Sequence, residues 1–590
     1  MLLGPWITIY IVYIYIYVAR TYSILETSRE TLHVQEHPNL TTSILTMAPH
    51  NTEDEHPATV LPEVDEEEVE YPPPPPLSAR PPRVLIIGAG SRGRIYARCT
   101  QQSSNGVVAA VAEPDDFKRQ QFGRNFIWGQ DGTVSPPDGS QFPGWREFVA
   151  WETARRERER AGEAVPEGVD AAFVCVRDEM HREVVVALAS LGLHIMCEKP
   201  FATTLDDCVA MYRALAPHQK DRVYSVGHVL RYSPHNMMLR KLLLGDRVIG
   251  DILSVVHTEP VGWWHFSHSY VRGNWRKESI TAPSLLTKSC HDIDIIMWLL
   301  CSPPPGSDEP PHLPTTVSSS GSLQFFKKSR KPKAAGDATN CLSCPIEKDC
   351  MYSSKRIYVG GRHQGLETGQ TDWPLSVVFP DIESFGKDER KEVLLERLKE
   401  DYDDLTPQEE VESRNWFGRC VFESDNDVCD EQTVSMTWDE DPLPSGRPSA
   451  DSLGGRGSKQ ATFHMIAQTK KQCQRYTYIY GTEGEIYADS RTITIEDFRT
   501  GETKVHKPRL ESLGHGGGDH GLTRQFIQAV DRVKNHSEAA EKAQQEYIGC
   551  SLEDIIRSHA MVFAAEEART GKKVIDWRDW WEAKVGANVA

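Results

Sequence analysis

A glycine-rich turn between an apolar run and a helical stretch is the most informative chemical feature of this chain. Residues 84–87 are apolar, and Gly88, Gly90 and Gly93 follow with the spacing G-x-G-x-x-G. The first glycine permits a tight turn, the second lets backbone approach a pyrophosphate, and the third lets helix and strand pack closely. Amides at the helix N-terminus then face the anion. The alternative is an ordinary tight turn between a strand and a helix.

An acidic residue stands where a ribose diol would be held. Glu113 ends a second apolar run, 107–112, and lies twenty residues beyond Gly93. Its carboxylate could take the diol and would repel a 2′-phosphate, so we expect NAD, although Arg119 nearby leaves NADP open. The sequence therefore predicts a dinucleotide site formed by Gly88, Gly90, Ser91, Arg92, Gly93 and Glu113.

A lysine ends a second buried strand. Residues 193–197 are followed by Glu198, Lys199 and Pro200. A lysine just past a strand's carboxyl end, in the crevice where a nicotinamide would lie, can hydrogen-bond a substrate hydroxyl and favour its alkoxide character. The alternative is a surface lysine paired with Glu198.

The elements that must position these residues form two patterns. Apolar runs alternate with helical stretches up to about residue 227, which predicts a doubly wound parallel sheet with strands at 84–87, 107–112, 170–177, 193–197 and 222–227. From about residue 245, alternating or β-branched runs predict a large, mostly antiparallel sheet with strands at 249–257, 323–326, 432–438, 461–466, 476–480 and 485–487. The fold class is α/β, with an N-terminal Rossmann sheet and a C-terminal α+β domain.

A chain of 590 residues is too long for one core. We expect an N-terminal extension at 1–82, a dinucleotide-binding domain at 83–228, and a substrate domain at 229–545. The substrate domain contains insertions at 302–316, 327–420 and 440–459. A C-terminal helix and tail at 546–590 should pack on the body.

The formal net charge of −19 is unevenly distributed. Residues 51–79 hold nine acidic residues and no Lys or Arg, with five prolines at 72–76, which predicts a disordered spacer. No basic patch with interleaved aromatic residues appears, so we expect no nucleic-acid partner. Several of the thirteen cysteines lie in apolar runs, which favours a reducing, cytoplasmic location.

The apolar segment at 2–19 has three interpretations. It is barely long enough to span a bilayer and lacks the flanks of a secretory signal. It could be a membrane anchor, a β-prone segment with no membrane role, or an artefact of the assigned start. We favour the last, with Met47 as the initiator, and do not expect a membrane partner.

The combined motifs resemble those of the Gfo/Idh/MocA family, the glucose–fructose oxidoreductase and inositol dehydrogenase group. The resemblance covers the glycine turn, residues 169–181, the triplet 198–200, a helix at 285–298 and a C-terminal stretch. It implies a Rossmann domain followed by an α/β domain with a large sheet. It also places the cofactor near Arg177, His181, Glu198 and Lys199.

The helix at 285–298 departs from the family pattern Asp-x-x-x-His-x-x-Asp. His291 and Asp294 match the pattern, whereas Thr287 stands at the first Asp position. An imidazole suits proton transfer from a substrate hydroxyl, so Lys199 and His291 are our candidate catalytic residues. Lys288, three residues before His291, is the candidate to replace part of the missing carboxylate's role. Alternatively, the reaction differs from that of the simple dehydrogenases.

Two loops are candidates for substrate contact. Residues 515–520, His-Gly-Gly-Gly-Asp-His, precede a helix, and their glycines permit close approach of backbone to a ligand. The alternative is a flexible connection with a helix cap at Asp519. Residues 263–276 mix Trp, His and Arg, which suits sugar stacking and hydroxyl binding, or simply covers the sheet. We assign substrate contacts to Trp275, Thr287, His515 and Asp519.

A cysteine cluster is the most unusual feature. Cys341 and Cys344 form a CxxC chelate, and Cys350 follows six residues later. Cys420 is our choice for the fourth thiolate of a structural zinc site. An iron–sulfur centre and unmetallated thiols are the alternatives.

Three functions compete. The first is an NAD(P)-dependent oxidoreductase acting on a sugar, cyclitol or related polyol. The second is a cofactor-binding regulator without turnover, which Lys199 and His291 argue against. The third is an NAD-dependent glycosidase of the same fold, which Thr287 leaves open. For any of them, the C-terminal sheet could form a homo-oligomer contact.

Overall fold

The computed structural model describes residues 75–131, 134–304, 306–443, 453–510 and 515–589. The apolar segment at 2–19, most of the acidic spacer and residues 444–452 of the insertion expected at 440–459 lie outside these ranges. Within the described part of the chain, no helix has the length and apolar character needed to cross a membrane.

The first sheet is parallel and doubly wound, as predicted. In the described residues it has six strands in the order β3-β2-β1-β4-β5-β6. Their bounds are β1 Arg83–Ile87, β2 Val107–Ala112, β3 Gln141–Phe142, β4 Ala171–Val174, β5 His194–Cys197 and β6 Tyr224–Val226. Helices α2 (Ser91–Ser103), α3 (Asp116–Phe126), α4 (Trp145–Arg160), α5 (His181–Ala189) and α6 (Leu205–Leu215) connect them. The sequence indicated five of these strands; β3, with two residues, gave no apolar run.

Strand order reverses between β1 and β4, which are hydrogen-bonded neighbours. The connections leave these two strands in opposite directions, so a crevice opens beyond their carboxyl ends. Apart from Arg83, both strands consist of buried apolar residues, as expected when helices cover both faces.

The second sheet is mixed, with nine strands among the described residues in the order β14-β13-β12-β11-β7-β10-β9-β8-β15. Only β7 and β10 pair in parallel here. The bounds are β7 Ile252–Pro260, β8 Thr316–Ser322, β9 Glu431–Trp438, β10 Lys459–Ile466, β11 Tyr476–Gly481, β12 Gly484–Ala488, β13 Ile493–Asp497, β14 Thr503–His506 and β15 Ile575–Asp576.

One predicted strand is wrong. Residues 323–326 do not extend a strand, because β8 occupies Thr316–Ser322 and ends before them. The amides of Gln324, Phe325 and Phe326 donate instead to the carboxylate of Asp430, at 2.7, 2.7 and 3.1 Å. This carboxylate satisfies the backbone donors that a neighbouring strand would otherwise take.

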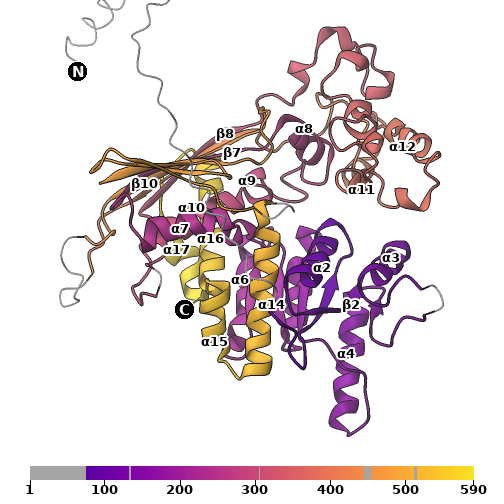
Figure 1. The fold of residues 1–590 in the computed structure, drawn as a ribbon. Coiled ribbons are helices and arrows are strands. Elements are labelled where there is room, and N and C mark those ends of the chain that lie inside the picture. The colour runs from indigo at the N-terminus through magenta and orange to yellow at the C-terminus, as the bar shows by residue number, and fades with distance from the viewer. Residues whose placement is uncertain (1–74, 132–133, 305, 444–452, 511–514, 590) are drawn as a thin grey trace, which may run out of the picture. The chain divides into compact units, whose positions relative to one another are not determined.

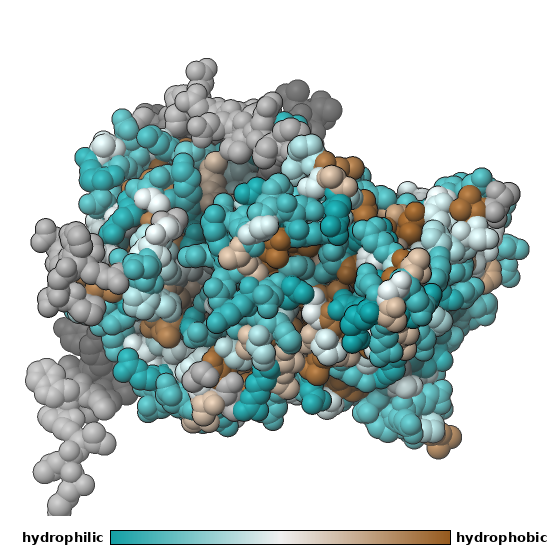
Figure 2. Space-filling view, turned by 90° about the horizontal axis from the view of Figure 1, so that it is seen from below, coloured by the Kyte–Doolittle hydropathy of each residue, from teal (hydrophilic) through white to brown (hydrophobic). Residues whose placement is uncertain are grey.

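Helices lie on the face of the second sheet that is turned toward the first (Figure 1). They are α7 (Pro234–Arg240), α10 (Cys290–Cys301) and α16 (Leu552–Gly571). Helix α16 contacts β8 on one side and α6 on the other, while α14 (Gly518–His536) packs against α2. The two sheets therefore share one continuous core. Seen from below, the surface is mostly hydrophilic and its hydrophobic patches are separate (Figure 2).

The long segment between β8 and β9 has a small core of its own. It contains α11 (Leu375–Val378), α12 (Arg390–Lys399) and α13 (Gln408–Ser413), and lies to one side of the sheet near α8 (Trp263–Phe266) (Figure 1). Ten buried residues form the core: Trp264, Ile357, Tyr358, Val359, Leu375, Val378, Ile382, Leu394, Leu398 and Phe417. Gln121 of α3 donates a hydrogen bond to Glu383, which ties this segment to the dinucleotide-binding side.

Candidate functional site

A cavity of about 760 Å³ opens in the crevice beyond the first sheet. Its walls come from the start of α2, from residues that follow β4, β5 and β6, from α10 and from residues 472–477. The predicted site residues that line it are Ser91, Arg92, Arg177, Glu198, Lys199, Trp275, Lys288, His291 and His515.

The glycine turn provides room beside this cavity. Gly88 has φ +95°, and a Cβ there would meet the carbonyl oxygen of Cys175 at 2.6 Å. A Cβ at Gly93 would lie 2.0 Å from the oxygen of Gly88, so only glycine lets α2 approach β1 this closely. A Cβ at Gly90 would meet nothing within 4 Å. The N-terminus of α2 also has no side-chain cap and no acidic residue in its first turn. These observations fit a pyrophosphate at the turn.

Glu113 is buried directly after β2. Its carboxylate accepts hydrogen bonds from the amides of Ala89 at 2.8 Å and Asp115 at 3.0 Å. Arg119 donates to the main-chain oxygen of Glu113 at 2.6 Å. The carboxylate is thus fixed beside the glycine turn, where a ribose diol would meet it.

Arg92 joins three elements at the edge of the cleft. It donates to Glu198 and to Asp519, each at 2.6 Å. Burial alone would raise the pKa of either carboxyl, but the guanidinium of Arg92 holds both pKa values below their ordinary range. Asp519 is fully buried, does not line the cavity, and lies 3.0 Å from Nδ1 of His515. Asp519 therefore holds Arg92 and His515 in place, and its assignment to substrate contact stays a prediction.

Lys199 points into the cavity from the end of β5. Its ammonium group donates to the main-chain oxygen of Thr287 at 2.7 Å and lies 5.2 Å from the ring centroid of Trp275. Trp275 donates from Nε1 to Asp178 at 2.8 Å, and burial raises the pKa of Asp178. The lysine therefore stands between a carbonyl and an aromatic face, with hydrogen-bonding capacity left for a ligand.

His291 faces Lys199 from the first turn of α10. It is 4% exposed, and its Nδ1 has no hydrogen-bond partner among the described residues. Burial, with the charge of Lys199 added, lowers the pKa of His291 well below its ordinary value. A neutral imidazole with a free ring nitrogen can accept a proton. The rings of His228 and His515 lie 5.7 and 6.0 Å away, centroid to centroid.

Thr287 does not reach the cavity. Its side chain is fully buried, and its hydroxyl donates to the oxygen of Pro283 at 3.3 Å. Helix α9 (Ser284–Thr287) turns this side chain into the helix layer, and its assignment to the substrate stays a prediction without support from the cavity lining. What Thr287 contributes is its main-chain oxygen, which accepts the hydrogen bond from Lys199.

Lys288 belongs to a buried ion network along one wall. Its ammonium group lies 3.1 Å from Glu259 and 3.0 Å from the sulfur of Cys473. Arg475 completes the network by pairing with Glu259 at 2.9 Å and with Asp292 at 2.5 Å. Although burial opposes the charge, Cys473 and Glu259 raise the pKa of Lys288. Lys288 is therefore held as a fixed cation in this wall, and its role as a replacement for the missing carboxylate stays a prediction.

Sequence reasoning missed several side chains of this cavity. Cys473 and Arg475 line it but stand in a segment with no recognisable motif. His265 and Asp178 lie inside stretches already singled out from the sequence and could have been selected. Trp373 comes from the insertion and lies 4.9 Å from His265, centroid to centroid. The insertion therefore supplies part of the wall.

His181, which the resemblance places near the cofactor, does not line the cavity. It is fully buried, and its two ring nitrogens lie 2.8 Å from the oxygen of Pro200 and 3.3 Å from that of Val176. It therefore joins the ends of two segments beneath the cavity. Arg177, by contrast, is exposed at the cavity rim and pairs with Glu179 at 3.1 Å.

The predicted zinc site is not assembled. Among the described residues, no three side chains of the metal-binding types are arranged to hold an ion. Arg272 is fully buried here and donates to the sulfur of Cys341 at 3.3 Å and to the oxygen of Tyr352 at 2.8 Å. Burial raises the pKa of Cys350 and of Cys420, which keeps both thiols protonated. A buried guanidinium thus stands where the thiolates were expected to converge on a metal.

Comparison with known proteins agrees with this geometry. Residues 82–228 match the model of an oxidoreductase family with an NAD-binding Rossmann fold. This part of the chain belongs to the Gfo/Idh/MocA family. The match confirms the predicted family and Rossmann fold.

Individual relatives cover less of the molecule. The 2,7-anhydro-N-acetylneuraminate hydratase of Escherichia coli is 31% identical over 132 residues, which are 22% of this chain and 34% of that protein. Inositol 2-dehydrogenase of Corynebacterium glutamicum is 26% identical over 222 residues, which are 37% of this chain and 53% of that protein. The chain thus matches only a third to a half of the length of these Gfo/Idh/MocA relatives.

Solved structures extend the fold comparison. Levoglucosan dehydrogenase in complex with NADH has a TM-score of 0.51 at 15% identity, covering 84% of this chain and 99% of that one. An inositol dehydrogenase homologue of Azotobacter vinelandii complexed with NAD+ has a TM-score of 0.51 at 14% identity, covering 85% and 98%. At these identities the likeness establishes the Gfo/Idh/MocA fold alone.

Proposed function

We propose that the protein is an NAD(P)-dependent oxidoreductase of a sugar, cyclitol or related polyol. The observation that carries this proposal is the pairing of Lys199 with His291 in the cavity beside the glycine turn. The ammonium group is a hydrogen-bond donor, and the imidazole is neutral with Nδ1 free. Dehydrogenation of an alcohol needs both, because the hydroxyl proton must leave as the carbon is oxidised.

The residues beside the turn fit a nicotinamide dinucleotide. Gly90 leaves open space, the first turn of α2 presents uncapped amides, and Glu113 is fixed at the end of β2. The cofactor, when bound, supplies the acceptor or donor of a hydride. The carboxylate of Glu113 favours NAD because it would repel a 2′-phosphate.

The chain's own residues would manage the proton. Lys199, held by the oxygen of Thr287, donates a hydrogen bond to the substrate oxygen and stabilises its negative charge. His291 accepts the hydroxyl proton at a ring nitrogen. Trp275 and Trp373 offer aromatic faces to the substrate's carbon framework.

A redox-neutral reaction is the second candidate, and two observations favour it. The first Asp of the family pattern is absent, and Thr287 does not replace it in the cavity. The Escherichia coli relative is named a hydratase, and addition of water causes no net oxidation. An NAD-dependent glycosidase belongs to the same class. A regulator without turnover is less well supported, because it would need neither Lys199 nor His291.

We also propose that the outer face of the second sheet joins two copies of the chain. The helices lie on its other face (Figure 1). Val256, Tyr478 and Tyr480 are 39%, 42% and 39% exposed on the adjacent strands β7 and β11. Light scattering of the purified protein, compared with Tyr478→Lys, tests this: a monomer in both cases would contradict it.

The function is tested in two steps. NADH and NADPH are first titrated by fluorescence against the full chain. A panel of polyols, including myo-inositol and glucose, is then incubated with NAD while NADH absorbance and products are followed. Net NADH formation supports the oxidoreductase, and conversion without NADH supports the redox-neutral reaction. Cofactor binding without any conversion across polyols and aryl glycosides would favour the regulator.

A further inference from the structure

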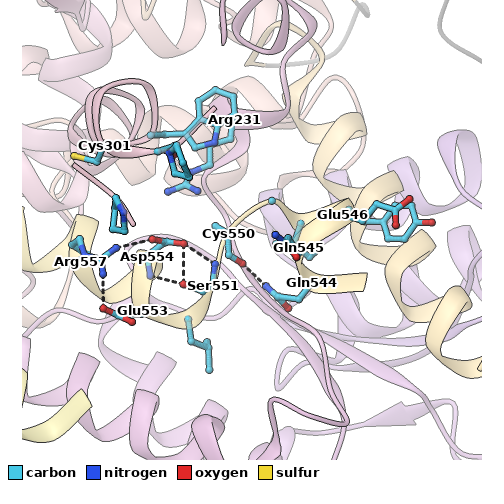
Figure 3. Close-up of a pocket in the computed structure, with 18 of the residues that line it drawn as sticks. Arg231, Cys301, Gln544, Gln545, Glu546, Cys550, Ser551, Glu553, Asp554 and Arg557 are labelled. Carbon is cyan, nitrogen blue, oxygen red and sulfur yellow. Dashed lines mark hydrogen bonds and ion pairs between the residues drawn. The ribbon is translucent and has the colours of Figure 1, made fainter. Parts of the chain in front are cut away.

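A second cavity, of about 900 Å³, lies against the C-terminal part of helix α10, at Met297, Trp298 and Cys301, and has no lining residue in common with the first. Figure 3 shows part of it, with Arg231 on one side and residues 544–557 on the other. Its walls come from the end of α7, from α10, from residues 541–550 and from the first turns of α16. None of the residues assigned to the dinucleotide or to the reaction lies here.

Two guanidinium groups in this cavity share one aromatic ring. Arg231 and Arg240 lie 6.0 and 5.0 Å from the ring centroid of Trp298. Arg231 is paired through two hydrogen bonds with the buried carboxylate of Asp294, at 2.6 and 2.7 Å. Among the described residues, no carboxylate forms an ion pair with Arg240. Arg231 therefore has a carboxylate partner, and Arg240 has none in the described structure.

The surroundings of Arg240 oppose its charge. Its Nε is buried without a hydrogen-bond partner in the described structure. Burial, followed by repulsion from Arg231, lowers the pKa of Arg240, and no acidic group acts in the other direction. A guanidinium remains charged under these conditions. The free-energy cost of removing it from water is therefore not offset by an acidic group of the protein. Native proteins rarely leave a buried polar group without a hydrogen-bond partner. An external anion would supply a partner for the guanidinium of Arg240.

The acidic residues of the opposite wall do not supply that anion. Glu553 and Asp554 are both engaged by Arg557, and Asp554 also closes the cap of α16 with Ser551 (Figure 3). Glu546 is exposed to solvent. Glu309 and Glu541 also line the cavity, and neither forms an ion pair with Arg240 in the described structure. The cavity therefore contains a cation without an acidic partner beside an aromatic surface.

We propose that this cavity binds a small anion, a carboxylate or a phosphate, which Arg240 holds beside the indole of Trp298. A guanidinium fork suits either group, because both present two oxygens in a plane. The ligand would contact α10, the helix that carries His291 seven residues before Trp298. The site is separate from the dinucleotide cleft and does not depend on the proposed function.

The test uses the full chain and two probes, inorganic phosphate and citrate, titrated separately by calorimetry. Each titration is repeated with NADH in excess, which fills any phosphate site at the glycine turn. We expect at least one probe to bind the wild type under both conditions. Arg240→Gln should weaken that binding by about tenfold or more, while Arg240→Lys should keep part of it.

Arg146→Gln is the matched control. Arg146 also lies over an indole, 4.3 Å from the ring centroid of Trp145, but it is exposed and ion-paired with Glu183. It should leave probe binding unchanged. Equal binding by wild type and Arg240→Gln, or no binding of either probe to wild type, would overturn the proposal. Phosphate binding alone identifies a phosphate ligand, and citrate binding alone identifies a carboxylate.

A thermal measurement keeps the test independent of calorimetry. Each probe that binds should raise the melting temperature of the wild type more than that of Arg240→Gln at the same probe concentration. Without a probe, Arg240→Gln should melt no lower than the wild type, because the substitution removes an uncompensated charge. Loss of stability in the absence of a probe would mean that the protein itself compensates Arg240, and would contradict the proposal.

Discussion

Lys199 is held by the main-chain oxygen of Thr287, at 2.7 Å, and not by a carboxylate. The contact links the end of β5 to α9. Lys288 directly follows α9 in the chain, and His291 lies in the first turn of α10. Because the acceptor is a backbone atom, the orientation of the lysine does not depend on the side chain at position 287. A threonine at this position is therefore compatible with the orientation of the lysine.

The first prediction follows from this contact. Thr287→Val removes a hydroxyl that bonds Pro283 but leaves the carbonyl oxygen in place. We expect the free energy of unfolding to fall by about 1 kcal/mol, the usual worth of one buried hydrogen bond, with turnover changed by less than about threefold. Urea unfolding and steady-state kinetics measure the two effects. A large loss of turnover in a stable variant would show that the hydroxyl itself takes part.

Lys199→Met and His291→Asn should act on turnover and spare the cofactor. Each removes a group positioned for proton handling, which is worth roughly 10²–10⁴-fold in rate. Affinity for NADH, measured by fluorescence, should change little. Lys241→Met serves as the control for loss of a lysine, since Lys241 is exposed and does not line the cavity. Near-normal turnover in either cleft variant would remove that residue from the mechanism.

Cofactor preference should depend on Glu113. Its carboxylate is fixed by the amides of Ala89 and Asp115 and would repel a 2′-phosphate. The wild type should bind NADH more tightly than NADPH, and Glu113→Gln should narrow that difference by about tenfold, which is the effect of about 1.4 kcal/mol. Parallel titrations give the ratio. Tighter NADPH binding by the wild type would contradict the assignment.

How much of the fold and site the sequence could predict depends on whether each interaction joins residues that are close or distant in the chain. The glycine turn, Glu113 and the strand before Lys199 are local signals, because turn geometry and apolar runs are set by neighbours in the chain. These features were predicted, and the parallel sheet they imply is confirmed. Trp373 lies in the long insertion, and Cys473 lies in the segment just before β11. Their positions depend on how these two segments fold back over the cavity. No local sequence pattern predicts such a contact.

The differences between prediction and structure have the same origin. The cysteine spacing is a valid chelate pattern, but Arg272, far away in sequence, enters the space between the thiols. Residues 323–326 have strand-forming side chains, yet the carboxylate of Asp430 captures their amides. Asp519 stands in a glycine loop typical of ligand contact, but Arg92 and His515 take up both of its oxygens. In each case a long-range partner overrode a local preference.

The buried pair of Lys288 and Glu259 should matter for stability. Glu259 is fully buried and shared between Lys288 and Arg475. Lys288→Met leaves it with one partner, and breaking a buried ion pair typically costs about 3–5 kcal/mol. Adding Glu259→Gln should recover part of the loss, since it removes the stranded charge. Chemical unfolding of both variants tests this. Glu259→Gln alone is the reference for coupling. If Glu259→Gln lowers the free energy of unfolding as much in the Lys288→Met background as in the wild type, the two residues are not coupled.

Acid should destabilise the fold partly through buried histidines. Burial lowers the pKa of His194, His228 and His268 to about 3. Their unfolded forms titrate near about 6.5, so between these values the unfolded chain binds more protons than the folded one. Stability therefore rises with pH through that window and is lost as the pH falls below about 6.5. At pH 5 each histidine should account for a loss of about 2 kcal/mol.

His194→Asn measures the contribution of one of these histidines to the pH dependence of stability. Nδ1 of His194 accepts a hydrogen bond from the amide of Val223 at 3.0 Å, and an asparagine oxygen can take the same role without titrating. Urea unfolding at several pH values from 5 to 6 should show a slope of stability against pH that is smaller by about 1.4 kcal/mol per pH unit, or one proton. His218→Asn, at a half-exposed position, should keep the wild-type slope. An unchanged slope in His194→Asn would mean that His194 is protonated in the folded state, and that its burial is compensated by a partner other than Val223.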